Sequence, residues 1–221
     1  MKKMVLQKLG LLLAERPLSF CLKKHIILKY MESLNLVRFT YSQILDRVLS
    51  ELVNNFQPDQ TIEVRKKMLA LAEEWNKYES QVIEELEKYP PYKFTPQSVK
   101  CYVVKNLPYT GISDPLIIKI AEDFELFIAT LIHELVHISI SQEENNLVTR
   151  IRKEFPETPD FRTQLHVVVN FIEYQILKKL FDKEKLDKIM NRELSLVGLK
   201  KAWEIVLTNE DKIGDIVTIL K

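Results

Sequence analysis

The sequence predicts a mainly helical α+β protein, and three observations carry that prediction. Glycine occupies only four of the 221 positions, far below its ordinary share of about 7%, which suits a chain built of helices. Over most of the chain, apolar residues recur at helical spacing. One interval, residues 98–120, instead holds β-branched and aromatic runs that are typical of strands.

Two adjacent prolines, Pro90 and Pro91, interrupt the helical pattern and mark the expected domain boundary. We expect a helical N-terminal region over residues 1–90, a core over 91–182, and C-terminal helices over 183–221 that pack on the core. In the first region, Thr40 and Gln43 stand in capping-box positions. The stretch 59–89 carries a near-heptad apolar stripe, which favours a helical hairpin arm or a packing helix.

The predicted core alternates short strands with two helices. Residues 98–106 and 115–120 read as strands, and Pro115 restricts the second strand to an edge of the sheet or to beginning at that residue. Asp123 can cap a helix over 124–142. A second strong helical pattern covers 161–182.

Composition limits the expected partners and location. Lysine and arginine number 32 against 31 acidic residues, for a net charge of +1, so there is no electrostatic case for nucleic acid or an anionic membrane. The chain has no apolar run of membrane-spanning length and no secretory signal pattern. We therefore expect a soluble cytoplasmic protein whose long N-terminal helices could mediate homo-oligomerisation.

The motif TLIHELVHIS, residues 130–139, carries the chemistry. His133 and His137 lie four residues apart on one helical face, separated by a rise of about 6 Å, so both imidazoles can hold one zinc ion. Glu134 is rotated by about 100° and can reach a metal-bound water as general base. Apolar neighbours predict a buried helix, where unpartnered polar groups would be costly and a metal would satisfy them.

The third metal ligand stays open at this point. The second helix offers His166 and Glu173, which share a face but lie about 10 Å apart along the axis, so both cannot bind one ion. Asn170 lies between them and could hold a ligand in place. Side chains that could stabilise an oxyanion are Tyr102, Tyr109, Tyr174, Arg150 and Arg152.

The stretch PLIIKI followed by LFIATLIHELVHISI resembles the core of the zincin metallopeptidases, and its compact proportions are similar to small archaeal minigluzincins. The resemblance covers about residues 98–182. It implies a small sheet packed on the HExxH helix, a second ligand-bearing helix, and hydrolysis of peptide bonds by zinc-activated water with Glu134 as general base. An extended peptide or protein substrate would pair with the edge strand through Leu116, Ile117 and Ile118.

Two other hypotheses compete with a peptidase. The chain could bind zinc but be latent or catalytically silent, and act as an interaction or regulatory module. The charged segment 142–160 or the C-terminal tail could then cover the site. Alternatively, the motif could be a buried helix without any metal.

Overall fold

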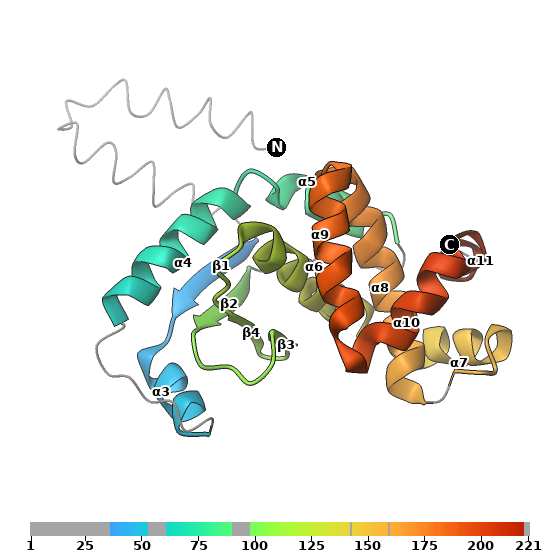
Figure 1. Cartoon of the computed structure of the whole chain (residues 1–221), viewed down its shortest axis with the longest axis horizontal. Coiled ribbons are helices and arrows are strands. Elements are labelled where there is room, and N and C mark those ends of the chain that lie inside the picture. The colour runs from blue at the N-terminus through green and yellow to red at the C-terminus, as the bar shows by residue number, and fades with distance from the viewer. Residues whose placement is uncertain (1–35, 53–60, 90–97, 142, 159, 219–221) are drawn as a thin grey trace.

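The structure is a computed structural model that describes residues 36–52, 61–89, 98–141, 143–158 and 160–218. Within them it confirms a mainly helical α+β fold with one small mixed sheet (Figure 1). The strands are β1 (Val37–Tyr41), β2 (Val99–Val104), β3 (Gly111–Ser113) and β4 (Leu116–Lys119).

Nine helices lie within the described residues. They are α3 (Gln43–Leu52), α4 (Thr61–Trp75), α5 (Glu79–Leu86), α6 (Phe124–Ile140), α7 (Glu144–Glu154), α8 (Phe161–Leu180), α9 (Lys183–Ser195), α10 (Val197–Thr208) and α11 (Glu210–Thr218). α6 lies between the sheet and the helices α8 to α10 (Figure 1).

The sheet has the strand order β1-β2-β4-β3, with β3 as the antiparallel edge strand. The expectation that residues 115–120 form an edge strand is therefore wrong. β4 pairs with β2 on one side and with β3 on the other, so Ile117 and Ile118 have sheet partners on both sides and Leu116 is paired with Ser113 of β3. The edge strand beside β4 is Gly111–Ser113, which the sequence analysis did not identify as a strand, and β1 forms the other edge of the sheet.

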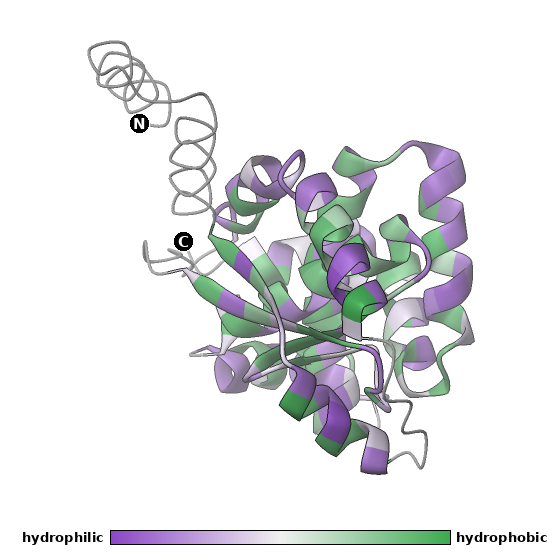
Figure 2. Cartoon of the chain, turned by 90° about the vertical axis from the view of Figure 1, so that its left-hand side faces the viewer, coloured by the Kyte–Doolittle hydropathy of each residue, from purple (hydrophilic) through white to green (hydrophobic). Residues whose placement is uncertain are grey.

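Alternation along the strands directs side chains to two cores. Cys101 and Val103 face the main core with α6 and α8, whereas Val104 and Ile117 join a small cluster against α3. Apolar residues accordingly gather along the strands and the inward sides of the helices in Figure 2. The main core fixes α6 between the sheet and α8. α6 carries the HExxH residues, and α8 carries His166 and Glu173.

The N-terminal region departs from the all-helical expectation. β1 pairs in parallel with β2, and Thr40 lies in that strand, so α3 begins after it with Ser42 Oγ accepting from Leu45 N at 3.3 Å. The long helix expected over 59–89 ends at Trp75 and resumes as α5. The sheet thus joins residues on both sides of the expected boundary at 90, while residues 1–35 lie outside the described ones.

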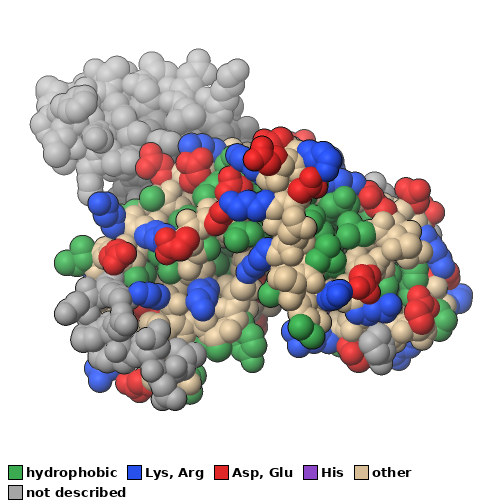
Figure 3. All heavy atoms as spheres, viewed as in Figure 1, with side chains coloured by type: hydrophobic (Ala, Val, Ile, Leu, Met, Phe, Trp, Pro, Cys, Tyr) green, Lys and Arg blue, Asp and Glu red, His purple; other side chains and the backbone are tan. Residues whose placement is uncertain are grey.

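Charged side chains of both signs are interspersed on the face seen in Figure 3. Among the described residues, no single helix has the length and apolar character to cross a membrane, and α6 with α7 would pass that test only as a bent pair.

Candidate metal centre

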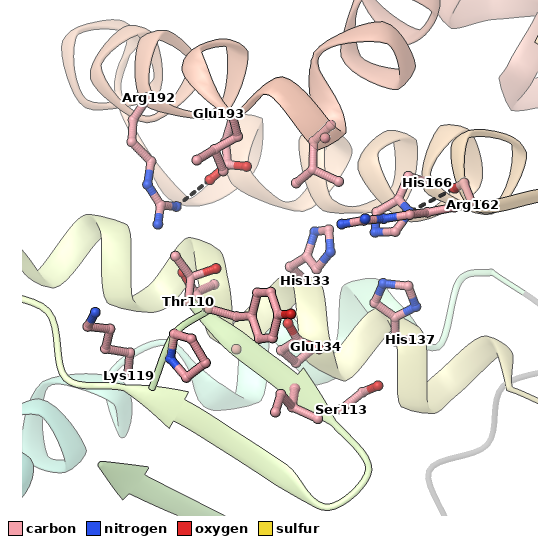
Figure 4. A pocket seen from close by; sticks show the side chains of 18 of the residues that line it. Thr110, Ser113, Lys119, His133, Glu134, His137, Arg162, His166, Arg192 and Glu193 are labelled. Carbon is pink, nitrogen blue, oxygen red and sulfur yellow. Dashed lines mark hydrogen bonds and ion pairs between the residues drawn. The ribbon is translucent and has the colours of Figure 1, made fainter. Parts of the chain in front are cut away.

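Three histidines from two helices meet at one point. One ring nitrogen from each of His133, His137 and His166 lies within 4.8 Å of the other two. The ring centroids are 5.0 to 5.4 Å apart. In Figure 4 the three rings surround a common space, with Glu134 at its edge. The structure thus brings His166, rather than Glu173, to the HExxH histidines as the third member of the cluster.

Both ligand helices are fixed at their first turn. The Asp123 carboxylate accepts from Glu125 N at 3.1 Å and Leu126 N at 3.3 Å, which confirms it as the N-cap of α6. Asp160 accepts from Thr163 N at 2.8 Å and starts α8. Such caps satisfy main-chain donors that the first turn leaves free. Because α6 also packs against α8, these two caps help to fix the positions of the histidines relative to one another.

Two of the histidines have a partner at Nδ1. His166 Nδ1 donates to Arg162 O, four residues earlier, at 2.8 Å. His133 Nδ1 lies 2.8 Å from Glu173 Oε2 and donates to it in the tautomer that leaves Nε2 free. A hydrogen bond at one ring nitrogen fixes the tautomer and orients the other nitrogen for a metal. Glu173 is therefore placed to hold His133, and not to bind the ion itself.

Burial favours the neutral imidazoles that a metal requires. It lowers the pKa of His137 to about 2 and that of His166 to about 4, and the neighbouring imidazole of His133 adds to both effects. Because a neutral imidazole keeps a lone pair free, both rings are ready to bind a cation at neutral pH.

The surroundings of Glu173 fit a bound cation. Glu173 is 1% exposed, and within the described residues its Oε1 has no hydrogen-bond partner. Burial raises the pKa of Glu173 well above its ordinary value, against the opposing effect of Arg192. A buried carboxylate requires a compensating positive charge. A cation held by the ring that bonds to Glu173 would supply that charge, so the residues present fit a metal ion.

Glu134 lies against the edge strand of the sheet. Its side chain is mostly buried, and burial, together with the charge of Glu173, raises its pKa, while His133 opposes the shift. A carboxylate with a raised pKa is a stronger base and is therefore better suited to accept a proton. β3 approaches so closely that a Cβ at Gly111 would lie 2.6 Å from Glu134 Oε1. Gly111 thus matters through close packing, a role that the sequence did not reveal.

Gly111→Ala is expected to retain the metal but to lower any hydrolytic rate that depends on Glu134. The added methyl would push the carboxylate from its place, and a misplacement of about 1 Å can cost on the order of 10²-fold in rate. Metal stoichiometry and kcat on one substrate would be measured together. Gly214→Ala on α11, away from the histidines, serves as control. Equal rates for Gly111→Ala and wild type would contradict this role for Gly111.

The histidines line a cleft of about 650 Å³ between β3 and the α8–α10 side of the molecule. Of the side chains considered for an oxyanion, Tyr109 lines this cleft, while Tyr174, Arg150 and Arg152 do not. Arg152 instead bonds to Gln164, and Tyr174 stacks edge-on with Trp203. The sequence missed four charged residues that line the cleft, which are Lys119, Arg162, Arg192 and Glu193.

Asn170 is fully buried, and among the described residues no hydrogen bond joins its amide to a histidine ring. With its amide oriented to suit its neighbours, its nitrogen donates to His166 O and its oxygen accepts from Trp203 Nε1, both at 3.2 Å. It therefore joins the main chain at His166 to α10 and supports α8, which differs from the direct contact with a ligand side chain that the sequence suggested.

No family model matches the chain, and no curated protein or solved structure matches it either.

Proposed function

We propose that the protein is a zinc-dependent metallopeptidase in which His133, His137 and His166 hold the ion and Glu134 is the general base. The observation that carries the proposal is the meeting of three imidazoles with a mostly buried carboxylate at the wall of a cleft. Three protein ligands with one open position are the usual arrangement of catalytic zinc. Zinc in particular is favoured because imidazole ligands suit it.

The donor set also argues for hydrolysis over a structural metal. Structural zinc is enclosed by four protein ligands, commonly with cysteines. Here the described residues supply three histidines, which line an open cleft of about 650 Å³. A zinc ion in such a site polarises a carbonyl and lowers the pKa of a water molecule.

The chain's own residues would then perform the proton transfers. Glu134 would accept a proton from the attacking water at a carboxylate oxygen and pass it to the leaving nitrogen. Its raised pKa suits both roles, because the carboxylate can take up the proton and hold it until the bond breaks. Arg162 and Tyr109 line the same cleft and are candidates to stabilise the developing oxyanion.

Zinc removal and return test the proposal. The metal-free chain is expected to take up about one zinc per chain. At zinc concentrations about 1,000-fold above Kd, binding stabilises the fold by about 4 kcal/mol, which raises Tm by roughly 8–16 °C for a domain of this size. Hydrolysis of a peptide library should appear on zinc addition and vanish with a chelator.

The controls separate the alternatives. Magnesium, which prefers six oxygen ligands, should neither raise Tm nor support hydrolysis. A chain that takes up no zinc would overturn the metal site. One that takes up zinc with the full rise in Tm, yet cleaves no peptide, would favour the silent zinc-binding protein.

A further inference from the structure

The hollow beside the histidines continues past them. A second hollow of about 580 Å³ lies next to the first, and the two share Ser113 and His137 in their linings. Ile138 and Ser141, at the C-terminal end of α6, line the second hollow. His137 therefore lies between the two hollows, while His133 and His166 line the first.

Successive residues of α6 and of the β3 edge strand line first one hollow and then the other. The first hollow is lined by residues 110–113 of the strand side and by Thr130 to His137 of α6. The second is lined by residues 113–116 and by His137 to Ser141. β3 and α6 thus run in the same direction and form walls that continue from one hollow into the next.

The length of these walls corresponds to a short extended peptide. From Thr130 to Ser141 the helix rises by about 16 Å, and an extended chain covers that distance with about five residues at about 3.3 Å each. His133 and His137 lie in the middle of this interval. A bond at the metal would therefore have about two residues of substrate on either side within the walls.

We propose that the site cleaves internal bonds of an extended polypeptide segment whose two ends lie outside the cleft, as an endopeptidase does. This inference rests on the proposed function and specifies its substrate class. Of the charged groups along the cleft, Arg192 pairs with Glu193, and the Lys100 ammonium lies 4.7 Å from the centroid of the Tyr102 ring. Lys119 in the first hollow and Asp114 and Glu144 in the second also line the cleft, so it is the continuity and length of the walls that favour cleavage of an internal bond.

The competing substrate is a chain terminus, and Arg162 is the residue that would hold it. Arg162 lines the first hollow beside His166, and it takes part in none of the ion pairs among the described residues. Its guanidinium could bind the terminal carboxylate of a peptide. It belongs to the side wall and closes neither end of the cleft. Terminal substrates would therefore use half of the available space.

Peptide capping tests the inference with zinc-loaded wild type. A library of octapeptides would be prepared with free ends and with N-acetyl and C-amide caps, and the products identified by mass spectrometry. Capped octapeptides are expected to be cut at internal bonds, at rates within about twofold of the free forms. Release of only one or two residues from free peptides, with capped peptides resistant, would overturn the inference while leaving the peptidase intact. If neither form is cut by the zinc-loaded chain, the proposed function fails as well.

A binding measurement avoids dependence on turnover. Glu134→Gln, loaded with zinc, is expected to bind capped octapeptides at least about tenfold more tightly than capped dipeptides, by calorimetry. Adding Ser141→Trp, which fills the second hollow, should remove most of that advantage, whereas Asn145→Trp, exposed and outside both hollows, should preserve it. Zinc content verifies that each variant is folded. Equal binding of dipeptides and octapeptides would overturn the inference.

Discussion

Replacing His166 by alanine is expected to abolish one-to-one zinc binding, whereas Glu173→Gln is expected to preserve it at lower affinity. His166 presents a ring nitrogen to the same point as His133 and His137. Glu173 instead contacts His133 Nδ1 at 2.8 Å. Loss of a partner that orients a ligand costs about 10–100-fold in metal affinity. Loss of the ligand itself leaves two imidazoles and no complete site.

Zinc content after dialysis and Kd from competition with a chromophoric chelator distinguish the two variants. His25→Ala changes the remaining histidine of the sequence and should retain full zinc. Metal-free Tm checks that His166→Ala is folded, since the variant also loses the bond to Arg162 O. If Glu173→Gln loses all zinc while His166→Ala keeps it, the ligand set is two histidines and a glutamate.

This pair of variants also shows where the sequence reached its limit. Spacing placed His133 and His137 on one face, and the structure brings them together. The spacing of His166 and Glu173 excluded binding of one ion by both residues, but it could not show which of the two is the third ligand. That choice depends on how α8 is rotated and shifted against α6, which is determined by packing between residues far apart in the chain. The raised pKa of Glu173 follows from the same packing.

The sheet was harder to predict than the helices. Asp123 and the apolar pattern after it predicted α6 because caps and helical periods are local signals. β3 has only three residues, too few to show alternation, and it is defined by its pairing with β4. β1 pairs with β2 about 60 residues further along. Such pairings leave little trace in a local pattern, so the edge strand was assigned to the wrong segment.

The cleft residues that the sequence missed share one property. Arg162 lies on α8 and Glu193 on α9. In the sequence, neither differs from an ordinary charged residue on the surface of a helix. Glu193 is in fact buried, and burial together with the charge of Glu173 raises its pKa. Only the assembly of α8, α9 and α10 beside β3 brings these groups to the histidines. No motif in one sequence encodes that assembly.

Glu134→Gln is expected to retain one zinc per chain and to lose peptide hydrolysis by about 10²–10⁴-fold. The amide has nearly the size of the carboxyl group, so the packing of Glu134 against Gly111 is preserved. It cannot accept a proton, and loss of a positioned general base costs a factor of this order. Single-turnover rates on one cleaved octapeptide, with zinc content measured on the same samples, give the comparison.

Two further variants sharpen the interpretation of that loss. Glu122→Gln removes a carboxylate whose side chain is 95% exposed and should leave the rate unchanged. Glu134→Asp keeps a base but withdraws it by one methylene, so its rate should fall between those of wild type and Glu134→Gln, because proton transfer requires hydrogen-bond reach. If Glu134→Gln hydrolyses peptides at the wild-type rate, Glu134 is not the base. Glu193, the other carboxylate that lines the first hollow, would then have to be tested in the same way, since it is buried and the charge of His133 lowers its pKa.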